Sequence, residues 1–378
     1  MMPPSQTNAS ATSISPSYRR MAQAFAALRR GESILIRAAN NRAAILRAAE
    51  FADYEDGQMQ EIAESATLLC LRRQHVEALG RKASGKRPVF TMPVSDLSVP
   101  QIFNITYGEA DALDDSVSLL GEKEDSLADL GTKILRQAKL LPTALIAGLT
   151  SDDPQHHNRL ATMYALPIVN AFDSDHHDST SHWQISKGAV AQLPLAAAPD
   201  SKIIMFRSEG GSENHFAIIV ADGDKHQTPL VRLHSQCVTG DVLGSLKCDC
   251  GPQLQTALSL MHENGGGVLL YLAQEGRDIG LMNKIRAYHL QDSGHDTVDA
   301  NHRLGFATDE RVFIPAAAML GQLDISSIKL LTNNPDKMAQ LAKFGIAVTE
   351  RVPLALDANP HNKAYLDTKR DKTGHLLD

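Results

Sequence analysis

The sequence of 378 residues is poor in aromatic side chains and has no excess of basic residues. Trp183 is its single tryptophan, aromatic residues make up 5% of the chain, and the formal net charge is −7. A nucleic-acid-binding surface usually carries a positive field, and sites for single strands usually offer rings on which bases stack. We therefore expect no nucleic-acid partner. The charge remains compatible with a local basic pocket for a small phosphorylated molecule.

Long apolar runs are absent as well. No stretch of 18 apolar residues occurs, so we expect no membrane span and no membrane partner. Residues 1–16 are rich in Ser, Thr, Asn and Pro and do not have the pattern of a signal peptide, so we expect a disordered lead-in. With 43% hydrophobic and 21% charged residues, the rest has an ordinary globular composition. We expect a cytoplasmic location.

Cysteine is scarce but strongly clustered. Of the four cysteines, Cys237, Cys248 and Cys250 fall within one short segment. Small buried thiols and disulfides are the alternatives, but an odd cluster in a chain without a secretion signal favours a metal. Three protein ligands are typical of a catalytic zinc, whose fourth position stays open for water or substrate. These three thiols are the predicted zinc ligands.

Apolar runs and helix-like segments alternate along the first half, which predicts an α/β architecture. A polar, His-rich stretch at 150–182 reads as a solvated loop, although His176 and His177 could also be metal ligands. Helices are expected at 17–30, 41–52, 59–65, 73–79 and 126–141, and strands at 33–37, 66–72 and 143–149.

A second α/β region is expected from residue 190 onward. The predicted organisation is two domains, 17–189 and 190–368, each a mixed sheet with flanking helices, followed by a polar tail at 369–378. In the second region, strands are expected at 202–208, 215–222, 229–235, 265–274, 327–334 and 346–354, and helices at 251–264, 281–293 and 335–344.

Polar residues suited to a phosphorylated nucleotide follow the strands of the second region. Loops after strands are the usual ligand sites of α/β sheets, and arginine and lysine are the usual partners of phosphate oxygens. Taken singly, each residue has an ordinary alternative, such as an ion pair for Arg277 or Arg286, packing for Tyr288 and a turn for Thr332–Pro335. The candidates are Arg232, Arg277, Arg311 and Lys337 as cations, Glu275 as a carboxylate for the guanine edge, Asp309 beside Arg311, and Thr332, Asn333 and Asn334 before a helix.

From about Leu193 to the C-terminus, the chain resembles GTP cyclohydrolase II, the first enzyme of riboflavin biosynthesis. The resemblance rests on RLHSQCVTGDVLGSLKCDCGPQL, QEGRDIGLMNKIRAY, NHRLGFATDER and LLTNNPDK, in this order. It implies that Cys237, Cys248 and Cys250 hold one zinc ion. It also implies that an activated water attacks C8 of guanine and that formate is released.

The resemblance also implies roles for other residues. Tyr288 corresponds to the tyrosine of the ring-opening step, Asp309 to a proton acceptor and Arg311 to a nucleophile toward the α-phosphate, with loss of pyrophosphate. Because the pKa of arginine is above about 12, an electrostatic role for Arg311 is the alternative. Magnesium is expected on the triphosphate. The implied substrate-binding positions are Arg232, Leu233, His234, Ser235, Gln236, Gln253, Glu275, Gly276, Arg277, Thr297, Thr332 and Lys337.

Two positions depart from the family pattern. Gln236 stands where glutamate is common, and Lys247 stands where arginine is common. The expected products are 2,5-diamino-6-ribosylamino-4(3H)-pyrimidinone 5′-phosphate, formate and pyrophosphate, made by a homodimer. The alternatives are a paralogue that stops at a formamide or uses another nucleotide, and a non-catalytic regulator that binds a nucleotide.

Residues 20–170 resemble, more weakly, 3,4-dihydroxy-2-butanone-4-phosphate synthase. That family needs an acidic loop after its first strand to bind magnesium, but residues 37–44 read RAANNRAA, without a carboxylate. Its Gly-His-Thr-Glu run has no counterpart before residue 133. Because a hard cation needs oxygen ligands, the resemblance predicts a synthase-like fold without synthase activity.

Overall fold

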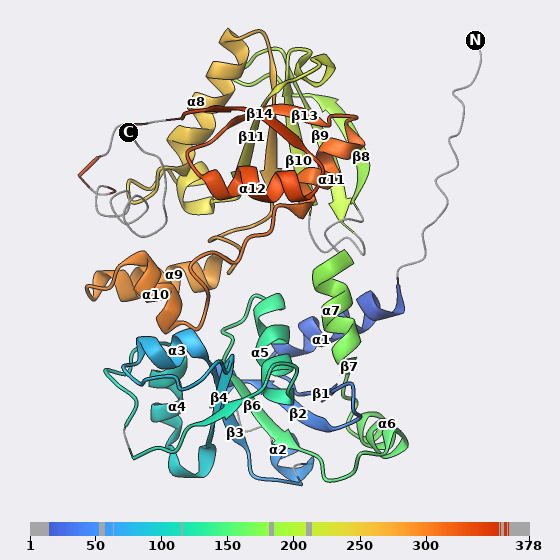
Figure 1. Ribbon diagram of the computed structural model, residues 1–378, viewed down its shortest axis with the longest axis vertical. Helices are drawn as coiled ribbons and strands as arrows, with labels where there is room; N and C mark the ends of the chain where they lie inside the picture. Colours follow the sequence, from blue (N-terminus) through green and yellow to red (C-terminus); the bar gives the residue numbers. More distant parts are fainter. Residues whose placement is uncertain are drawn as a thin grey trace.

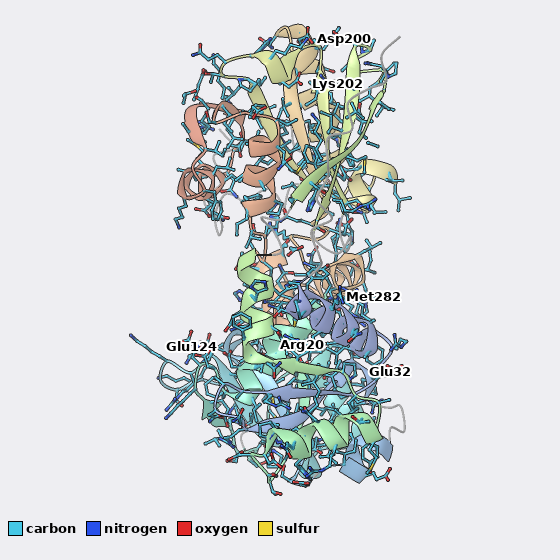
Figure 2. All side chains as sticks on the ribbon, turned by 90° about the vertical axis from the view of Figure 1, so that its right-hand side faces the viewer. Arg20, Glu32, Glu124, Asp200, Lys202 and Met282 are labelled. Carbon is cyan, nitrogen blue, oxygen red and sulfur yellow. The ribbon has the colours of Figure 1, made fainter. Side chains whose placement is uncertain are left out.

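The computed structural model describes residues 15–52, 57–62, 64–114, 116–180, 185–208, 214–354, 356, 359–360 and 362. These residues form two seven-stranded sheets with flanking helices, one sheet in each half of the chain (Figure 1). The predicted α/β architecture of two domains is confirmed. Most of the expected lead-in and all of the expected tail lie outside the described residues. Seen from the side, Met282 lies between the two halves, and Asp200 and Lys202 lie at the far end of the second (Figure 2).

The first sheet has the strand order β5-β4-β3-β6-β2-β1-β7. All neighbours are antiparallel except β1 and β7, which are parallel. Its strands are β1 Ile34–Arg37, β2 Ala43–Ala48, β3 Leu68–Arg72, β4 Val89–Pro93, β5 Leu120–Glu122, β6 Ala144–Gly148 and β7 Ile168–Asn170. Its helices are α1 Pro16–Arg29, α2 Gly57–Ile62, α3 Arg73–Ala78, α4 Val99–Thr106, α5 Leu127–Gln137, α6 Pro154–Met163 and α7 Ala171–Thr180, with 3-10 turns at Ala49–Phe51 and Val94–Asp96.

Two expectations for the first half are wrong. The expected helix at 41–52 is the strand β2, all of whose residues are buried between β1 and β6. A short apolar run buried on both faces has no alternation, so its sequence does not separate strand from helix. The expected loop at 150–182 contains α6, β7 and α7. Asp153 begins α6 by accepting from the N–H groups of Gln155 and His156, with Pro154 in the first turn.

His176 and His177, the two histidines considered as metal ligands, lie on α7 and pack against aromatic rings. The His177 ring lies 5.2 Å from the Phe25 ring and 6.1 Å from the Tyr18 ring of α1, centroid to centroid. The His176 ring stacks on Phe172 at 5.6 Å. Within the described ranges, the only group of residues arranged to hold a metal is elsewhere, so neither histidine belongs to a ligand cluster.

The second sheet has the order β14-β13-β11-β12-β10-β9-β8. It begins at Ile185, ahead of the expected boundary at 190, and the helices α10 and α11 were not expected. Its strands are β8 Ile185–Gln192, β9 Ser201–Ser208, β10 Asn214–Val220, β11 Leu230–Ser235, β12 Gly267–Leu272, β13 Ser327–Leu331 and β14 Ala347–Val352. Its helices are α8 Cys250–Glu263, α9 Leu281–Asp292, α10 Thr297–Arg303, α11 Ile314–Gln322 and α12 Pro335–Lys343, with a 3-10 turn at Gly223–Lys225 and a π turn, η5, at Val238–Val242.

The central strand β11 explains where the polar loops meet. It pairs in parallel with β12 on one side and with β13 on the other. Parallel neighbours bring their carboxyl ends to one edge of the sheet, where ligands bind in α/β folds. The segments that follow β11, β12 and β13 therefore lie together at this edge.

The two halves contact each other through α9, α10 and the segment after α10, which face the first half (Figure 1). A buried apolar cluster crosses the boundary, with Leu141 and Tyr107 from the first half against Leu290, Leu304 and Phe306 from the second. Arg303 of α10 donates to the carbonyl oxygens of Gly108 and Ala110 at 2.8 and 3.0 Å. The part of the chain that the structure describes has no helix long and apolar enough to cross a membrane.

Candidate active site and metal centre

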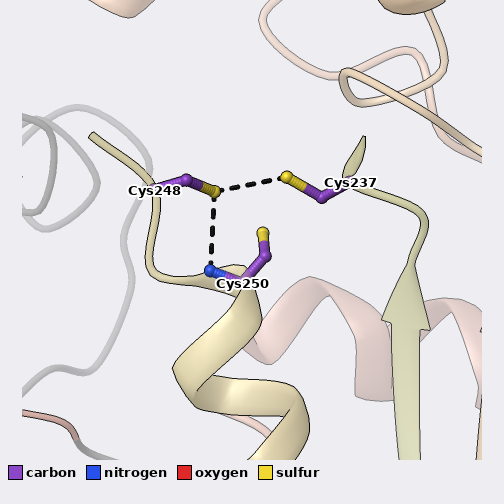
Figure 3. A group of neighbouring side chains, drawn as sticks. All are labelled: Cys237, Cys248 and Cys250. Atoms are coloured by element: carbon purple, nitrogen blue, oxygen red, sulfur yellow. Dashed lines mark hydrogen bonds between the residues drawn. The ribbon is translucent and has the colours of Figure 1, made fainter. Parts of the chain in front are cut away.

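The three clustered cysteines come together from three chain segments. Cys237 follows β11, Cys248 lies in the turn after η5, and Cys250 begins α8 (Figure 3). Their sulfur atoms all lie within 4.8 Å of one another. The Cys237 and Cys248 sulfurs are 3.3 Å apart, and these two residues are 3% and 6% exposed. The predicted cluster is therefore present and largely buried.

The cluster fits a thiophilic metal ion. Tetrahedral zinc–sulfur bonds of about 2.3 Å place two sulfur ligands roughly 3.8 Å apart, close to the spacing found here. To bring the three sulfurs this close, the backbone at Gly240 lies against the sulfur atoms and the backbone at Gly251 lies against Gly240. A β-carbon at Gly240 would lie 3.1 Å from both the Cys237 and the Cys248 sulfur, and one at Gly251 would lie 2.4 Å from the Gly240 carbonyl oxygen. A side chain is therefore excluded at Gly251, and one at Gly240 would press on the sulfur atoms.

The three sulfurs influence one another's ionisation. Hydrogen bonds from the Cys248 and Cys250 thiols, together with Lys284, lower the pKa of Cys237 far below its ordinary value. The hydrogen bond with Cys237, together with burial and repulsion from a thiolate at Cys237, raises the pKa of Cys248 to about 11. A bound cation would remove this repulsion and let all three thiols ionise.

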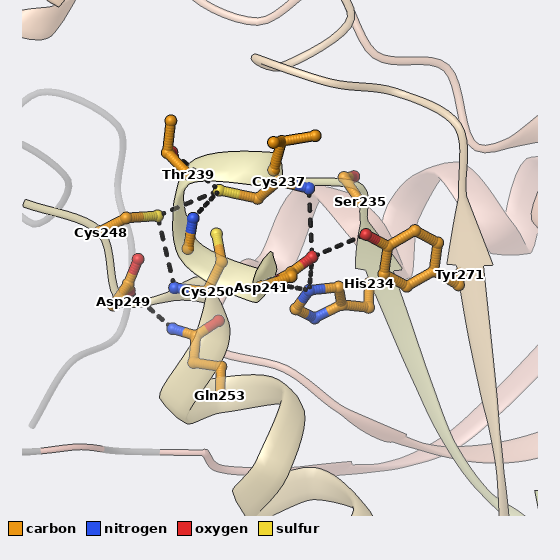
Figure 4. Close-up of polar contacts among 12 residues, drawn as sticks. His234, Ser235, Cys237, Thr239, Asp241, Cys248, Asp249, Cys250, Gln253 and Tyr271 are labelled. Carbon is orange, nitrogen blue, oxygen red and sulfur yellow. Dashed lines mark hydrogen bonds and ion pairs between the residues drawn. The ribbon is translucent and has the colours of Figure 1, made fainter. Parts of the chain in front are cut away.

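A buried carboxylate, Asp241 of η5, orients the first cysteine (Figure 4). It accepts from the Cys237 N–H and from His234 Nε2, each at 3.1 Å, and from the Tyr271 hydroxyl at 2.8 Å. The His234 and Tyr271 rings stack with centroids 5.5 Å apart. Burial, which outweighs the nearby Asp241, lowers the pKa of His234, so its ring is neutral near pH 7. The network fixes the loop that carries Cys237.

Lys284 of α9 fixes the same loop from the other side. Its ammonium lies 3.0 Å from the Cys237 sulfur and 2.8 Å from Glu275 Oε1. Burial opposes its charge, but these two partners raise the pKa of Lys284 above its ordinary value. The other oxygen of Glu275 accepts from the Val238 N–H at 2.7 Å. Both oxygens of the carboxylate expected to meet guanine are thus already engaged within the protein.

A cavity of about 500 Å³ opens beside the cysteines, a size typical of small-molecule sites. Of the sequence-predicted residues, only Glu275 and Asp309 are not part of its wall. Gln236 and Lys247, the two residues that differ from the family pattern, also line the cavity. The predicted residues in the wall are the three cysteines, Arg232, Leu233, His234, Ser235, Gln236, Gln253, Gly276, Arg277, Tyr288, Thr297, Arg311, Thr332, Asn333, Asn334 and Lys337.

Three cations converge on the wall of this cavity. Burial lowers the pKa of Arg232 to about 10. Burial, reinforced by repulsion from Arg232 and Arg311, also lowers the pKa of Lys337 well below its ordinary value. Arg311 Cζ and Lys337 Nζ both lie over the Phe313 ring, 5.6 and 5.3 Å from its centroid. Clustered buried cations with shifted pKa values are typical of an anion-binding site.

Hydrogen-bonding capacity is also left open at the cavity. The buried Arg232 Nε and His234 Nδ1 atoms have no hydrogen-bond partner within the protein. Arg232 uses its other nitrogens to donate to Gln253 Oε1 at 2.6 Å and to the Leu331 carbonyl oxygen at 3.0 Å. Buried polar atoms are rarely left unsatisfied, so these two atoms are suited to a polar ligand.

Asp309 and Arg311 pair with each other at the edge of the cavity. Arg311 donates from Nε and Nη2 to the two Asp309 oxygens at 2.9 and 2.6 Å. Its Nη1 lies 3.4 Å from the Ser235 hydroxyl. Burial disfavours the Asp309 charge, but Arg311 and Arg277 hold the pKa of Asp309 below its ordinary value. The aspartate is therefore ionised. It does not line the cavity itself, but it bonds to Arg311, which does.

Tyr288 lies between two lysines on the cavity wall. Lys247 Nζ is 5.6 Å and Lys284 Nζ 5.9 Å from its ring centroid. Lys247 also pairs with Asp292 at 2.5 Å. The lysine that replaces the usual arginine is thus anchored beside the predicted catalytic tyrosine.

Sequence reasoning did not single out Asp241, Tyr271, Lys284 or Phe313. Asp241 and Lys284 stand inside the quoted motifs, next to the predicted residues, and both are charged residues that the structure buries. A buried charge normally requires a partner. A charged residue inside a motif of buried residues was therefore the signal that could have identified Asp241 and Lys284. Tyr271 and Phe313 carry no such signal, because aromatic residues are ordinary core residues.

The sequence model of the GTP cyclohydrolase II family matches residues 186–353. A GTP cyclohydrolase-2 of Azospirillum brasilense is 40% identical over 371 residues, covering 95% of this chain and 94% of the relative. The chain belongs to the GTP cyclohydrolase II family. The predicted family and the predicted enzyme class, a hydrolase, are therefore confirmed.

Other relatives match part of the chain. A GTP cyclohydrolase-2 of Shigella boydii is 50% identical over 195 residues, covering 52% of this chain and 99% of the relative. The "Riboflavin biosynthesis protein RibBA" of Cytophaga hutchinsonii is 40% identical over 249 residues, covering 65% of this chain and 61% of the relative. A solved two-domain 3,4-dihydroxy-2-butanone 4-phosphate synthase from A. baumannii aligns with 89% of this chain and 100% of its own, at 16% identity and a TM-score of 0.35. The structural similarity is too low to support an argument.

Proposed function

We propose that this enzyme converts GTP into 2,5-diamino-6-ribosylamino-4(3H)-pyrimidinone 5′-phosphate, formate and pyrophosphate, with one zinc ion held by Cys237, Cys248 and Cys250. The observation that carries the proposal is the meeting of the three clustered thiols with Arg232, Arg311 and Lys337 around one cavity. The thiols suit a soft, Lewis-acidic metal, and the cations suit a polyphosphate.

The cations would bind the triphosphate. Arg232 and Arg311 repel the Lys337 ammonium, which lowers the pKa of Lys337 beyond the effect of burial. Phosphate oxygens would turn this repulsion into attraction, so the site is arranged for a negative ligand before it arrives. Magnesium bound to the triphosphate oxygens would balance the remaining phosphate charge.

Zinc at the three thiols would supply a Lewis acid and a nucleophile derived from water at neutral pH. The chain's own residues hold that centre. Gly240 N–H and Lys284 Nζ donate to the Cys237 sulfur at 3.3 and 3.0 Å. Such donors orient a ligand and set its basicity. Tyr288, on the wall beside them, would hold or deliver a proton as the five-membered ring opens.

Arg311 would act on the α-phosphate by its charge. Nε and Nη2 both donate to the ionised Asp309, which keeps the guanidinium protonated. A nucleophilic arginine would need a free electron pair on nitrogen, and this pairing opposes deprotonation. We therefore assign Arg311 the stabilisation of negative charge as pyrophosphate leaves, and Asp309 the orientation of Arg311.

The first half would have no synthase activity. At the place of the acidic loop, Arg37 donates to Asn158 Oδ1 at 3.0 Å and to Asn170 Oδ1 at 3.5 Å. Over the described ranges, the three cysteines are the only group of three or more His, Cys, Asp or Glu residues placed to hold a metal ion. The Azospirillum relative, which aligns with nearly the whole chain, carries only the GTP cyclohydrolase-2 name, in keeping with this proposal.

The test of the cyclohydrolase reaction is incubation of the purified protein with GTP, Mg²⁺ and Zn²⁺, with formate and pyrophosphate quantified together. Equal amounts of the two products are expected. Pyrophosphate without formate would mean an arrested variant of the reaction. Neither product would contradict the proposal and favour a non-catalytic nucleotide-binding protein.

A further inference from the structure

The loop at 305–311 connects the cavity to the first half of the chain. It joins α10 to the segment before α11 and contains Asp309 and Arg311. One end contacts the cavity, where Arg311 lies 3.4 Å from the Ser235 hydroxyl. Elsewhere the loop contacts the first half, where Gly305 and Glu310 both bond to Arg72. The loop is therefore a physical link between the two halves.

Glu310, between the two proposed catalytic residues, is held by arginines of the first half. Its Oε1 accepts from Arg72 Nη1 at 2.9 Å, and its Oε2 lies 3.5 Å from Arg136 Nη1. Oε1 also accepts from the Ala307 N–H at 2.7 Å, which closes the loop on itself. The Glu310 side chain is 9% exposed, so these contacts are shielded from water.

The start of the loop is also held by the first half, at the end of strand β3, where Arg72 lies. The Gly305 carbonyl oxygen accepts from Arg72 Nη1 at 3.2 Å and from Gln74 Nε2 at 2.8 Å. Gly305 has a φ of +81°, and a β-carbon there would lie 3.1 Å from Pro142 Cγ and 3.2 Å from His75 Nδ1. The backbone at this point lies directly against the first half, and only glycine allows the approach.

We propose that the first half of this protein positions Asp309 and Arg311 for the cyclohydrolase reaction, through the contacts of Arg72 and Arg136 with Glu310. Arg72, Arg136 and Glu310 are positioning residues, because none of them lines the cavity. The inference rests on the proposed roles of Asp309 and Arg311. It gives the inactive synthase-like half a function in catalysis by its neighbour.

The charge of Glu310 depends on these arginines. Burial raises the pKa of Glu310, and Arg72 and Arg136 more than reverse this effect, so its pKa lies below the ordinary value. Loss of the arginines would leave a buried carboxylate without a cationic partner, which is strongly destabilising for the local conformation. The loop would then leave its position, and Asp309 and Arg311 would move with it.

The chain supplies a matched control in Glu50. It is 7% exposed, lies at the same boundary, accepts from the Leu141 N–H at 3.0 Å, and pairs with Arg286 at 2.7 Å. Like Glu310, it is a buried carboxylate bonded to one backbone N–H and to arginine across the boundary. It does not contact the 305–311 loop. The same substitution at the two positions separates loop positioning from general attachment of the halves.

The experiment compares Glu310→Gln with Glu50→Gln in the full chain. Glu310→Gln should lower kcat for pyrophosphate release about tenfold to a hundredfold, because small misplacements of reacting groups have effects of this size. KM for GTP and zinc content should change little, and Glu50→Gln should keep kcat within about twofold at a similar melting temperature. Equal loss of kcat in the two variants would overturn the proposal.

The arginine side is tested separately. The double variant Arg72→Ala/Arg136→Ala should reproduce the loss of kcat, and Arg72→Lys/Arg136→Lys should recover part of it. Unchanged kcat in the double alanine variant would overturn the role of the first half. Hydrogen exchange of the 305–311 peptide, measured without GTP, should accelerate in the double alanine and Glu310→Gln variants but not in Glu50→Gln. Because this readout needs no turnover, it tests the positioning even if the proposed reaction itself is wrong.

Discussion

The two halves of this enzyme have sheets of the same size and very different polar groups at their strand ends. In the second, the ends of β11, β12 and β13 bring thiols, arginines and a lysine to one cavity. In the first, the turn between β1 and β2 has Arg37, Asn40, Asn41 and Arg42 and no carboxylate. Sheets of equal size can thus carry different site chemistry, since packing depends on the core and chemistry depends on a few loop residues.

The first half nevertheless keeps strong contacts with its neighbour. Charged residues at the boundary are paired across it, among them Glu310 with Arg72 and Glu50 with Arg286. Surface ion pairs contribute little stability, but pairs this buried fix geometry because breaking one leaves an uncompensated charge. The proposal that one half performs the reaction and the other holds a loop of its site accounts for both features.

The largest expected effect concerns the thiols. Cys248→Ser should abolish formate release and remove bound zinc, because two thiols and a hydroxyl no longer form the three-thiolate site. Cys70→Ala removes a fully buried thiol of the first half and should keep full zinc content and turnover. Zinc is measured by mass spectrometry of the metal in both variants. Turnover and zinc at wild-type levels in Cys248→Ser would refute the metal assignment.

A smaller effect is expected for the hydroxyl of Tyr288. Tyr288→Phe should lower formate release by about tenfold to a thousandfold, the range of a lost general acid or base, and pyrophosphate release much less. The matched change in the first half is Tyr164→Phe, whose hydroxyl donates to Glu61 at 3.2 Å on the surface. It should change neither product. Loss of both products in equal proportion from Tyr288→Phe would mean that the tyrosine only shapes the cavity.

The smallest effect, on stability, concerns a lysine in each half. The pKa of Lys337 is lower in the folded protein than in the unfolded chain, so folding releases a proton. The free energy of unfolding therefore rises with pH between these two pKa values. Lys337→Met should therefore raise the free energy of unfolding by about 1 kcal/mol at pH 7, while weakening GTP binding. This gain over wild type should shrink as the pH rises toward about 10.

Lys133→Met is the control for that change. Lys133 pairs with Asp175 at 3.3 Å on the surface of the first half, so its replacement should change stability by less than about 1 kcal/mol, with no rise. Urea unfolding at pH 7 and pH 9.5 measures both variants. A destabilised Lys337→Met protein at pH 7 would show that the cation cluster is not strained in the absence of ligand.

The sequence predicted the metal cluster and most of the cavity wall, because motif residues at strand ends converge when the strands are parallel. It did not predict β2, whose buried apolar residues have no distinguishing period, or α7, whose polar residues concealed a helix beside α1. It also did not predict that Glu275 is engaged by Lys284 and Val238. Such a pairing depends on the distance between α9 and the end of β12, which local sequence does not encode.

The most direct test of the account gives one preparation of the purified full chain two substrates in separate assays. With GTP, Mg²⁺ and Zn²⁺, we expect formate and pyrophosphate in equal amounts. With ribulose 5-phosphate and Mg²⁺, we expect no dihydroxybutanone phosphate. Formation of dihydroxybutanone phosphate, or GTP left intact by zinc-loaded protein, would contradict the division of roles between the two halves.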